Sequence, residues 1–206
     1  MLELVTIDSK YIDYLRNFDN KVCFNKDFSH TRPYVGVVFK LKDNRYFAPL
    51  TSSGKGAKLK QQPKIESLTF FPIKNCSLGG VNMNNMIPVI DDVLTKIDMQ
   101  LSENDTEEDI AYKTLLIEQL RFLSANEKLL RKKANIIYSM KNNGKLYPNY
   151  NKVTCNFKLL EEKSKEYGMK NFRKPTAMEQ YFNDKKSSEN IEVKTTKKNQ
   201  PADGIK

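Results

Sequence analysis

Hydroxyl and cationic side chains follow directly after an apolar run in the first third of the chain. The run Tyr46–Leu50 (YFAPL) has the composition of a buried strand, and directly after it come Thr51, Ser52, Ser53 and Lys55. Hydroxyl groups, main-chain N–H groups and an ammonium group at a strand-to-loop junction can together hold a phosphate. The stretch therefore predicts an anion site. The alternative is a solvated loop whose lysines only keep the protein soluble.

The order of these residues does not fit a nucleotide-binding P-loop. That motif requires GxxxxGK[ST], in which the glycines precede the lysine and a helix follows it. Here the hydroxyl residues precede Lys55, and Pro63 stands where the helix would have to be established. A phosphotransferase of the P-loop type is therefore not expected, and the phosphate should belong to another kind of ligand.

Further candidate residues come at the start of the strongest strand signal, Tyr34–Leu41 (YVGVVFKL). If this strand pairs with residues 45–50 as an antiparallel hairpin, its start lies beside the end of the other strand. Arg32 and Tyr34 would then meet the hydroxyl-rich junction at one edge of the sheet. A guanidinium group binds phosphate oxygens as a fork, and an aromatic ring can stack an unpaired base. The alternatives are a core position for Tyr34 and a simple surface position for His30.

The overall composition favours a polyanionic partner. The 206 residues include 35 Lys and Arg against 25 Asp and Glu, which gives a net charge of +10 and a pI near 9.3. Such a surplus attracts polyanions, nucleic acid before membrane. No apolar run approaches the roughly 18 residues that span a bilayer, and the N-terminus does not have the pattern of a signal peptide.

Cysteine and histidine usage indicates a reducing compartment and no metal centre. The three cysteines are odd in number, widely spaced and free of CxxC pairs, so we interpret them as reduced thiols of a cytoplasmic protein. The chain has a single histidine. The acidic clusters at 91–92 and 107–109 are expected to be solvated helix faces or partners of a helix dipole. We therefore expect no metal and no other cofactor.

The sequence predicts an α+β fold, a mainly antiparallel sheet with helices around it. The apolar pattern indicates strands at residues 2–6, 34–41, 45–50, 67–74 and around 85–89. Helical spacing indicates a helix at 9–18 capped by Ser9, a pair from Thr106 that breaks near 124–126, and a helix at 156–167 closed by Gly168. Residues 1–173 are expected to form one domain, and the lysine-rich residues 174–206 a flexible tail.

Five short segments occur in an order and at spacings that closely resemble the ToxN/AbiQ family, the endoribonuclease toxins of type III toxin–antitoxin systems. They are VTIDSKYIDYLRNFDNKV (5–22), RPYVGVVF (32–39), YFAPLTS (46–52), NMIPVI (85–90) and CNFKLLEEK (155–163). The resemblance extends from about Leu4 to Lys170 and identifies Ser52 as the family serine. In the common pattern, Ser-Pro-Lys, fewer residues separate the serine from the lysine, so Lys55 or Lys58 could fill the lysine position.

The resemblance implies a compact, strongly twisted antiparallel sheet akin to the Kid/MazF toxins and a metal-independent endoribonuclease. It implies cleavage of A-rich single-stranded RNA, in cellular and phage messages, to 2′,3′-cyclic phosphate and 5′-hydroxyl ends. The antitoxin would be an RNA pseudoknot that the toxin processes from repeats, in a closed ring of three proteins and three RNAs. Such systems halt growth during phage infection. Neither DNA nor a membrane is an expected partner.

These residues can be given roles in that reaction. Pancreatic-type ribonucleases use two histidines, and this chain has only His30, so positioning and charge should provide most of the rate. Arg32 and Lys55 are assigned to the charge that develops on phosphorus, and Thr51 and Ser52 to orienting the phosphate. The residues assigned to RNA binding are His30, Tyr34, Ser53, Lys58 and Lys60.

The sequence does not assign the two proton transfers to single residues, and it leaves one alternative function. Lys55, crowded by other cations, could have a lowered pKa and transfer a proton, while His30 is a candidate general base on its chemistry alone. The alternative function is a non-catalytic basic RNA-binding protein. It would use the same charge, aromatic ring and phosphate site without turnover.

Overall fold

The computed structural model describes residues 2–25, 32–41, 44–51, 68–172 and 178. The chain forms one compact unit up to Gly168, and residues 169–206 belong to a second. The predicted site residues outside the described ranges are His30, Ser52, Ser53, Lys55, Lys58 and Lys60. Of the predicted tail, residue 178 alone is described.

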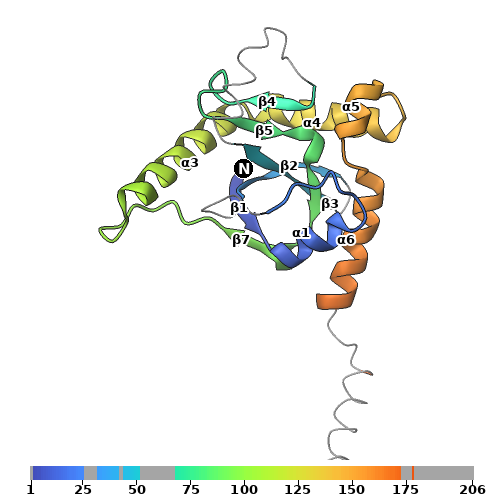
Figure 1. Ribbon diagram of the computed structural model, residues 1–206, viewed down its shortest axis with the longest axis horizontal. Helices are drawn as coiled ribbons and strands as arrows, with labels where there is room; N and C mark the ends of the chain where they lie inside the picture. Colours follow the sequence, from blue (N-terminus) through green and yellow to red (C-terminus); the bar gives the residue numbers. More distant parts are fainter. Residues whose placement is uncertain (1, 26–31, 42–43, 52–67, 173–177, 179–206) are drawn as a thin grey trace, which may run out of the picture. The chain divides into compact units, whose positions relative to one another are not determined.

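A seven-stranded sheet forms the centre of the first unit (Figure 1). Its strands are β1 (Glu3–Ile7), β2 (Tyr34–Leu41), β3 (Asn44–Thr51), β4 (Phe70–Pro72), β5 (Gly80–Asn82), β6 (Ile87–Val89) and β7 (Leu94–Lys96). The strand order is β4-β5-β3-β2-β1-β7, β6 also pairs with β3, and these pairs are antiparallel. The predicted α+β class is confirmed.

β2 and β3 form the hairpin that the sequence predicted. Tyr34 at the start of β2 is opposite Pro49 near the end of β3, and the register shifts within β2. On its other side, the end of β3 pairs with β5, where Thr51 is opposite Gly80. A side chain does not fit at residue 80, because a Cβ atom there would lie 2.1 Å from the Phe70 ring. The end of β3 is therefore held closely between two neighbouring strands.

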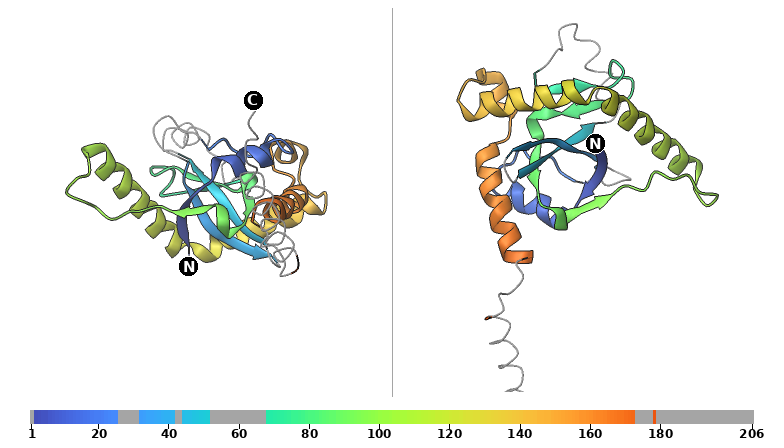
Figure 2. Two further views of the ribbon diagram at one scale, coloured as in Figure 1. Left: turned by 90° about the horizontal axis from the view of Figure 1, so that it is seen from below. Right: turned by 180° about the vertical axis from the view of Figure 1, so that it is seen from behind.

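Helices surround this sheet, and Figure 2 shows the beginning of α3 projecting away from it. The helices are α1 (Ser9–Arg16), α3 (Glu107–Ala125), α4 (Glu127–Asn142), α5 (Pro148–Val153) and α6 (Phe157–Phe172), with short 3₁₀ turns η1 (Met83–Asn85) and η2 (Asp91–Val93). The predicted break in the long helical pair is confirmed at Asn126. Within the described ranges, no helix combines the length and apolar character that crossing a membrane requires.

Two predicted helix boundaries are wrong. Asp8, rather than Ser9, caps α1, because its carboxylate accepts hydrogen bonds from two N–H groups of the first turn. α6 does not end at Gly168 but continues to Phe172, and Ile90 packs against the helix at the glycine. A glycine inside a helix costs only about 1 kcal/mol, which such packing can offset.

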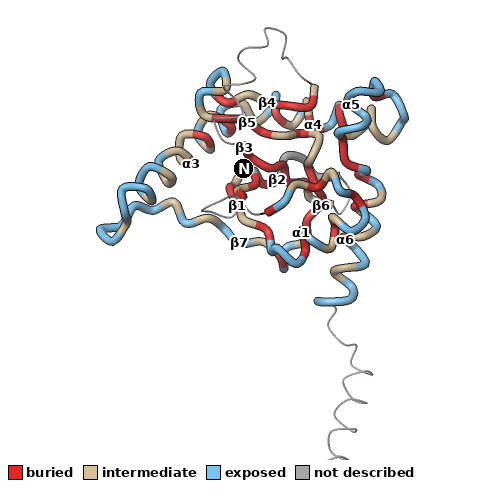
Figure 3. Tube along the Cα trace, viewed as in Figure 1, coloured by how far each residue is buried: buried red, intermediate tan, exposed pale blue. Residues whose placement is uncertain are grey.

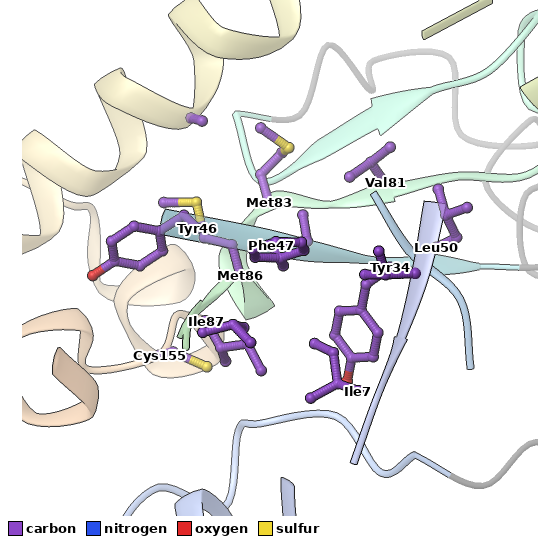
Figure 4. Packing of buried hydrophobic residues seen from close by; sticks show 14 of the residues in the cluster. Ile7, Tyr34, Tyr46, Phe47, Leu50, Val81, Met83, Met86, Ile87 and Cys155 are labelled. Carbon is purple, nitrogen blue, oxygen red and sulfur yellow. The ribbon is translucent and has the colours of Figure 1, made fainter. Parts of the chain in front are cut away.

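One hydrophobic cluster joins the sheet to the helices (Figures 3 and 4). Tyr46 and Phe47 of β3 are fully buried in it. The hydroxyls of Tyr46 and of Tyr138 (α4) both donate to the Glu161 carboxylate of α6, at 2.7 and 2.8 Å. Burial, together with the hydrogen bond to Glu161, raises the pKa of Tyr138 to about 12, so this phenol stays protonated and keeps donating. β3 is thereby tied to two C-terminal helices.

Candidate active site

The predicted phosphate site begins at Thr51, the last residue of β3. Thr51 is only 6% exposed, and its Oγ1 donates a long hydrogen bond of 3.5 Å to the carbonyl oxygen of Gly80. Its hydroxyl therefore faces β5 and anchors the end of the strand. Ser52 follows Thr51 directly in the sequence, at the point where β3 ends.

Arg32 lies beside the end of β3, as the antiparallel register predicts. The carbonyl oxygen of its neighbour Pro33 accepts a hydrogen bond from the Leu50 N–H at 3.0 Å. The guanidinium group of Arg32 donates from Nε to the Phe24 carbonyl oxygen at 2.8 Å and from Nη1 to the Leu50 carbonyl oxygen at 3.1 Å. One cation thus joins the loop after α1 to the residue that precedes Thr51.

These contacts favour a positioning role for Arg32 over the direct contact with phosphate that the sequence suggested. Two of its donor groups bind main-chain oxygens, and the residue is only 8% exposed. A phosphate could reach these two donors only if their hydrogen bonds opened. The positive charge still lies at the end of β3, where it raises the local electrostatic potential.

Tyr34 lies in the core and not at the RNA-binding surface that the sequence suggested. Its side chain is fully buried, so its ring offers no face on which a base could stack (Figure 4). Burial raises the pKa of the Tyr34 hydroxyl far above its usual value, and the nearby Cys23 thiol acts in the same direction. The phenol therefore stays neutral and does not serve as a base.

Phe24 presents an exposed aromatic ring near this edge, which the sequence did not single out. It is 63% exposed, and the guanidinium carbon of Arg16 lies 3.3 Å from its ring centroid. The Phe24 carbonyl oxygen accepts a hydrogen bond from the same Arg32 guanidinium group that binds Leu50 of β3, so Arg32 links the Phe24 main chain to the end of that strand. An exposed ring backed by a guanidinium group can stack an unpaired base. Phe24 lies in an irregular loop, where no periodic pattern marks it.

A buried carboxylate fixes the loop after α1 to the start of α6. Asp19 accepts hydrogen bonds from Lys21 Nζ (2.8 Å), from the Lys21 N–H (3.0 Å) and from the Asn156 N–H (2.6 Å). Burial opposes ionisation of Asp19, but the hydrogen bonds from Lys21 and Asn156 outweigh it and lower its pKa. Asn85 of η1 donates to the Lys21 carbonyl oxygen at 2.7 Å. We call these four residues, Asp19, Lys21, Asn85 and Asn156, the Asp19 clamp.

We expect Asp19→Ala to lower the free energy of unfolding by about 2 kcal/mol, because the partly buried Lys21 ammonium and the Asn156 N–H lose their acceptor. Since the folded-state pKa of Asp19 is lowered, its contribution is present above the unfolded-state pKa of about 3.9 and is lost as the pH falls through the folded-state value. Urea unfolding followed by circular dichroism, at neutral and at acidic pH, measures both effects.

The control for this measurement is Asp13→Ala, which removes an exposed carboxylate from α1. It should change the free energy of unfolding by less than about 0.5 kcal/mol. An equally small change for Asp19→Ala at neutral pH would show that the clamp contributes nothing to stability.

The acidic clusters and the cysteines have structural surroundings. The acidic residues at 107–109 form the first turn of α3, where Thr106 and Asp109 make a capping box, so the helix-dipole interpretation is confirmed for them. Asp91 of η2 forms an ion pair with Arg45. The cysteines are free thiols, and burial raises the pKa of Cys155 far above its usual value. In the part of the chain that the structure describes, no group of three or more His, Cys, Asp or Glu side chains could hold a metal ion.

Together, these observations define a small α+β protein whose central hairpin brings Arg32 beside the end of β3, next to Thr51. The family model described as "Toxin ToxN, type III toxin-antitoxin system" matches residues 3–165. The chain belongs to this family.

Relatives of known structure or name agree with this assignment. Endoribonuclease ToxN of Bacillus thuringiensis subsp. kurstaki is 38% identical over 168 residues, which cover 79% of this chain and 82% of the relative. The solved structure of AbiQ, a lactococcal anti-phage endoribonuclease of a type III system, superposes on this chain with a TM-score of 0.68 and a sequence identity of 30%. The match covers 82% of this chain and 98% of AbiQ. Another solved structure comes from a type III system whose toxin is inhibited by a non-coding RNA pseudoknot. Its chain has a TM-score of 0.65 and a sequence identity of 35% to this chain, and the match covers 81% of this chain and 97% of the other.

Proposed function

We propose that this chain is the endoribonuclease toxin of a type III toxin–antitoxin system. The family match over residues 3–165 and the endoribonuclease relative support the class. The observation that carries the proposal is the contact at the end of β3, where Arg32 holds Leu50 and so fixes the strand just before Thr51 and Ser52. Catalysis that depends on positioning requires such a fixed phosphate site, whereas a loop that only keeps the protein soluble does not.

The proposed reaction is attack of a ribose 2′-hydroxyl on the adjacent phosphate. The 2′-oxygen loses its proton and bonds to phosphorus, the bond to the 5′-oxygen breaks, and that oxygen gains a proton. The products are a 2′,3′-cyclic phosphate and a 5′-hydroxyl. Ser52 donates to a phosphate oxygen, and Lys55 or Lys58 stabilises the extra negative charge. His30 and Lys55 are the candidates for the two proton transfers, and Thr51 keeps the end of β3 in place.

RNA binding in this proposal combines charge with an exposed ring. The net charge of +10 attracts a polyanion, and Phe24 stacks an unpaired base beside the cleaved bond. Ser53, Lys58 and Lys60 bind the RNA backbone. The substrates are A-rich single strands of cellular and phage messages, which places the toxin in the cytoplasm.

The proposed inhibitor is an RNA pseudoknot that the toxin cuts from a repeated precursor. A pseudoknot of this kind inhibits the toxin of the related solved system, and we propose a closed ring of three proteins and three RNAs here. Loss of the antitoxin during phage infection would release the toxin and halt growth, in line with the anti-phage activity of AbiQ. Tandem repeats of a few tens of nucleotides are expected directly upstream of the gene.

Cleavage of an A-rich single strand should persist in excess EDTA, because lysine and hydroxyl groups rather than a metal ion stabilise the developing charge. The 3′ ends of the products should resist poly(A) polymerase until a cyclic phosphatase removes the phosphate. Cleavage that stops in EDTA and returns with magnesium would contradict the metal-independent mechanism. RNA that is bound but never cut would support the alternative, a non-catalytic RNA-binding protein.

A further inference from the structure

A pocket of about 310 Å³ lies between β4 and the corner where α3 passes into α4. This volume is in the range of sites that hold small organic molecules. Its lining combines apolar side chains with carboxamides and lysines: Phe71, Phe122 and Leu129, then Asn75 and Asn126, then Lys74 and Lys133. Such a combination suits a planar, polar-edged group with negative charge beside it.

The pocket lies at the same end of the sheet as the proposed phosphate site. Thr51 is opposite Gly80, and Gly80 is opposite Pro72, which lines the pocket. Neighbouring strands lie about 4.8 Å apart, so two steps across the sheet place Pro72 about 10 Å from Thr51. An RNA strand with one phosphate at the end of β3 can therefore place a neighbouring nucleotide in the pocket.

The apolar part of the pocket leaves surface that a flat base would cover. Leu129 is 48% exposed, and Phe122 is only partly buried against the core. Lys133 Nζ lies 5.7 Å from the centroid of the Phe71 ring, and both residues line the pocket. Removing such apolar surface from water is favourable, and a base provides a flat face for it.

Two carboxamides at the rim can contact the edge of a base. Asn126 donates from Nδ2 to the Phe122 carbonyl oxygen at 2.8 Å, which fixes the orientation of its amide. Asn75 is exposed and has a φ of 51°, a left-handed conformation that asparagine tolerates. A carboxamide offers an acceptor and a donor in the spacing that matches N6 and N7 of adenine.

The lysines provide charge for the phosphates beside that base. Lys74 Nζ lies 3.4 Å from a carboxylate oxygen of Glu118, and both side chains are about half exposed. A pair that is so open to solvent contributes little and can exchange its carboxylate for a phosphate. Lys133 lies on α4 one turn beyond Leu129, so its ammonium group is close to the base-binding surface.

We propose that this pocket binds an unpaired base, adenine in preference to uracil, of the RNA strand that crosses the end of β3. The proposal rests on the proposed ribonuclease function and adds a specificity site to it. Phe122 and Leu129 cover a face of the base, Asn75 and Asn126 bind its edge, and Lys133 binds an adjacent phosphate. Part of the preference for A-rich strands then comes from a pocket separate from the bond that is cut.

The test measures binding of labelled oligoadenylate and oligouridylate of equal length with 2′-O-methyl riboses. These probes are not cleaved, because the attacking hydroxyl is blocked. Fluorescence anisotropy should show that the wild-type chain binds oligoadenylate about tenfold more tightly than oligouridylate. Leu129→Ala and Asn75→Gly should each reduce the ratio of the two dissociation constants by at least about threefold. Glycine adopts the left-handed conformation without strain, so Asn75→Gly removes only the carboxamide. Ile136→Ala, which shortens another exposed aliphatic side chain of α4, should leave the ratio unchanged.

A charge reversal tests the phosphate contact separately. Lys133→Glu should weaken binding of both probes about tenfold, because both carry the same phosphates. The matched control is Lys132→Glu, an equal change of charge at an exposed position on the same helix, and it should weaken binding less than about threefold.

The outcomes separate this proposal from the one on which it rests. If both probes bind but the ratio is the same in wild type, Leu129→Ala and Asn75→Gly, the pocket proposal is overturned and the ribonuclease proposal stands. If the wild-type chain binds neither probe, the proposed function fails and the pocket proposal fails with it. Circular dichroism on each variant shows that a changed affinity does not come from unfolding.

Discussion

Replacing Ser52 by alanine should abolish toxicity and leave the fold and RNA binding nearly unchanged. The serine hydroxyl is proposed to donate to a phosphate oxygen whose negative charge grows in the transition state. Loss of one such donor costs about 10²–10³ in rate. Ser52 itself is uncharged, so the attraction between RNA and a chain with a net charge of +10 is retained.

Growth and cleavage assays together test this expectation. Wild type and Ser52→Ala are expressed without antitoxin at matched protein levels, and single-turnover cleavage and anisotropy on one A-rich RNA separate chemistry from binding. Ser102→Ala, which changes an exposed serine before α3, should stay fully toxic. A Ser52→Ala protein that arrests growth as wild type does would remove Ser52 from the catalytic groups.

Arg32→Ala should lower the free energy of unfolding by about 3 kcal/mol and slow cleavage as well. The substitution removes a buried cation that donates to the carbonyl oxygens of Phe24 and Leu50, and a hydrogen bond to a charged group contributes about 1.5–3 kcal/mol. Without it, the Leu50 carbonyl oxygen just before Thr51 loses its hydrogen bond from the guanidinium group. Arg32→Lys should recover only part of the loss, because one ammonium group does not reproduce the fork of the guanidinium group.

Urea unfolding combined with single-turnover cleavage distinguishes the two roles considered for Arg32. Positioning through the main chain predicts that stability and cleavage fall together. Direct phosphate binding predicts slower cleavage at normal stability, and that result would contradict the positioning role. Arg45→Ala is the control, because the Arg45 partner Asp91 has a side chain that is 78% exposed, and removing such a pair should cost less than about 1 kcal/mol.

The hairpin could be predicted from the sequence, and so could the position of Arg32 at the end of its second strand, because both depend on local patterns. The segments Tyr34–Leu41 and Asn44–Thr51 are long, mainly apolar and separated by turn residues. Antiparallel pairing alone then brings Arg32 to the end of the second strand. The long helices were predictable for the same reason, since their spacing is periodic and Thr106 is a recognisable cap.

The partners of individual side chains could not be predicted in the same way. Arg32 binds carbonyl oxygens eight and 18 positions away, and every residue has a carbonyl. Alternation along a strand shows that one face is buried but not which face, so the core position of Tyr34 was not fixed by its sequence. Phe24 is exposed in an irregular loop, where there is no alternation to read. β5 and β7 contain three residues each, too few to show a period.

The Asp19 clamp also has a consequence for synthesis on the ribosome. The side chains proposed for catalysis all precede Lys60 in the sequence, but the clamp closes only after Asn156 has been translated and has left the exit tunnel. The growing polypeptide therefore contains its reactive groups long before the loop that carries Phe24 and supports Arg32 has its final anchor. Fragments released from stalled ribosomes before this point have no clamp. The clamp therefore closes late in translation, after all the residues proposed for catalysis have been synthesised.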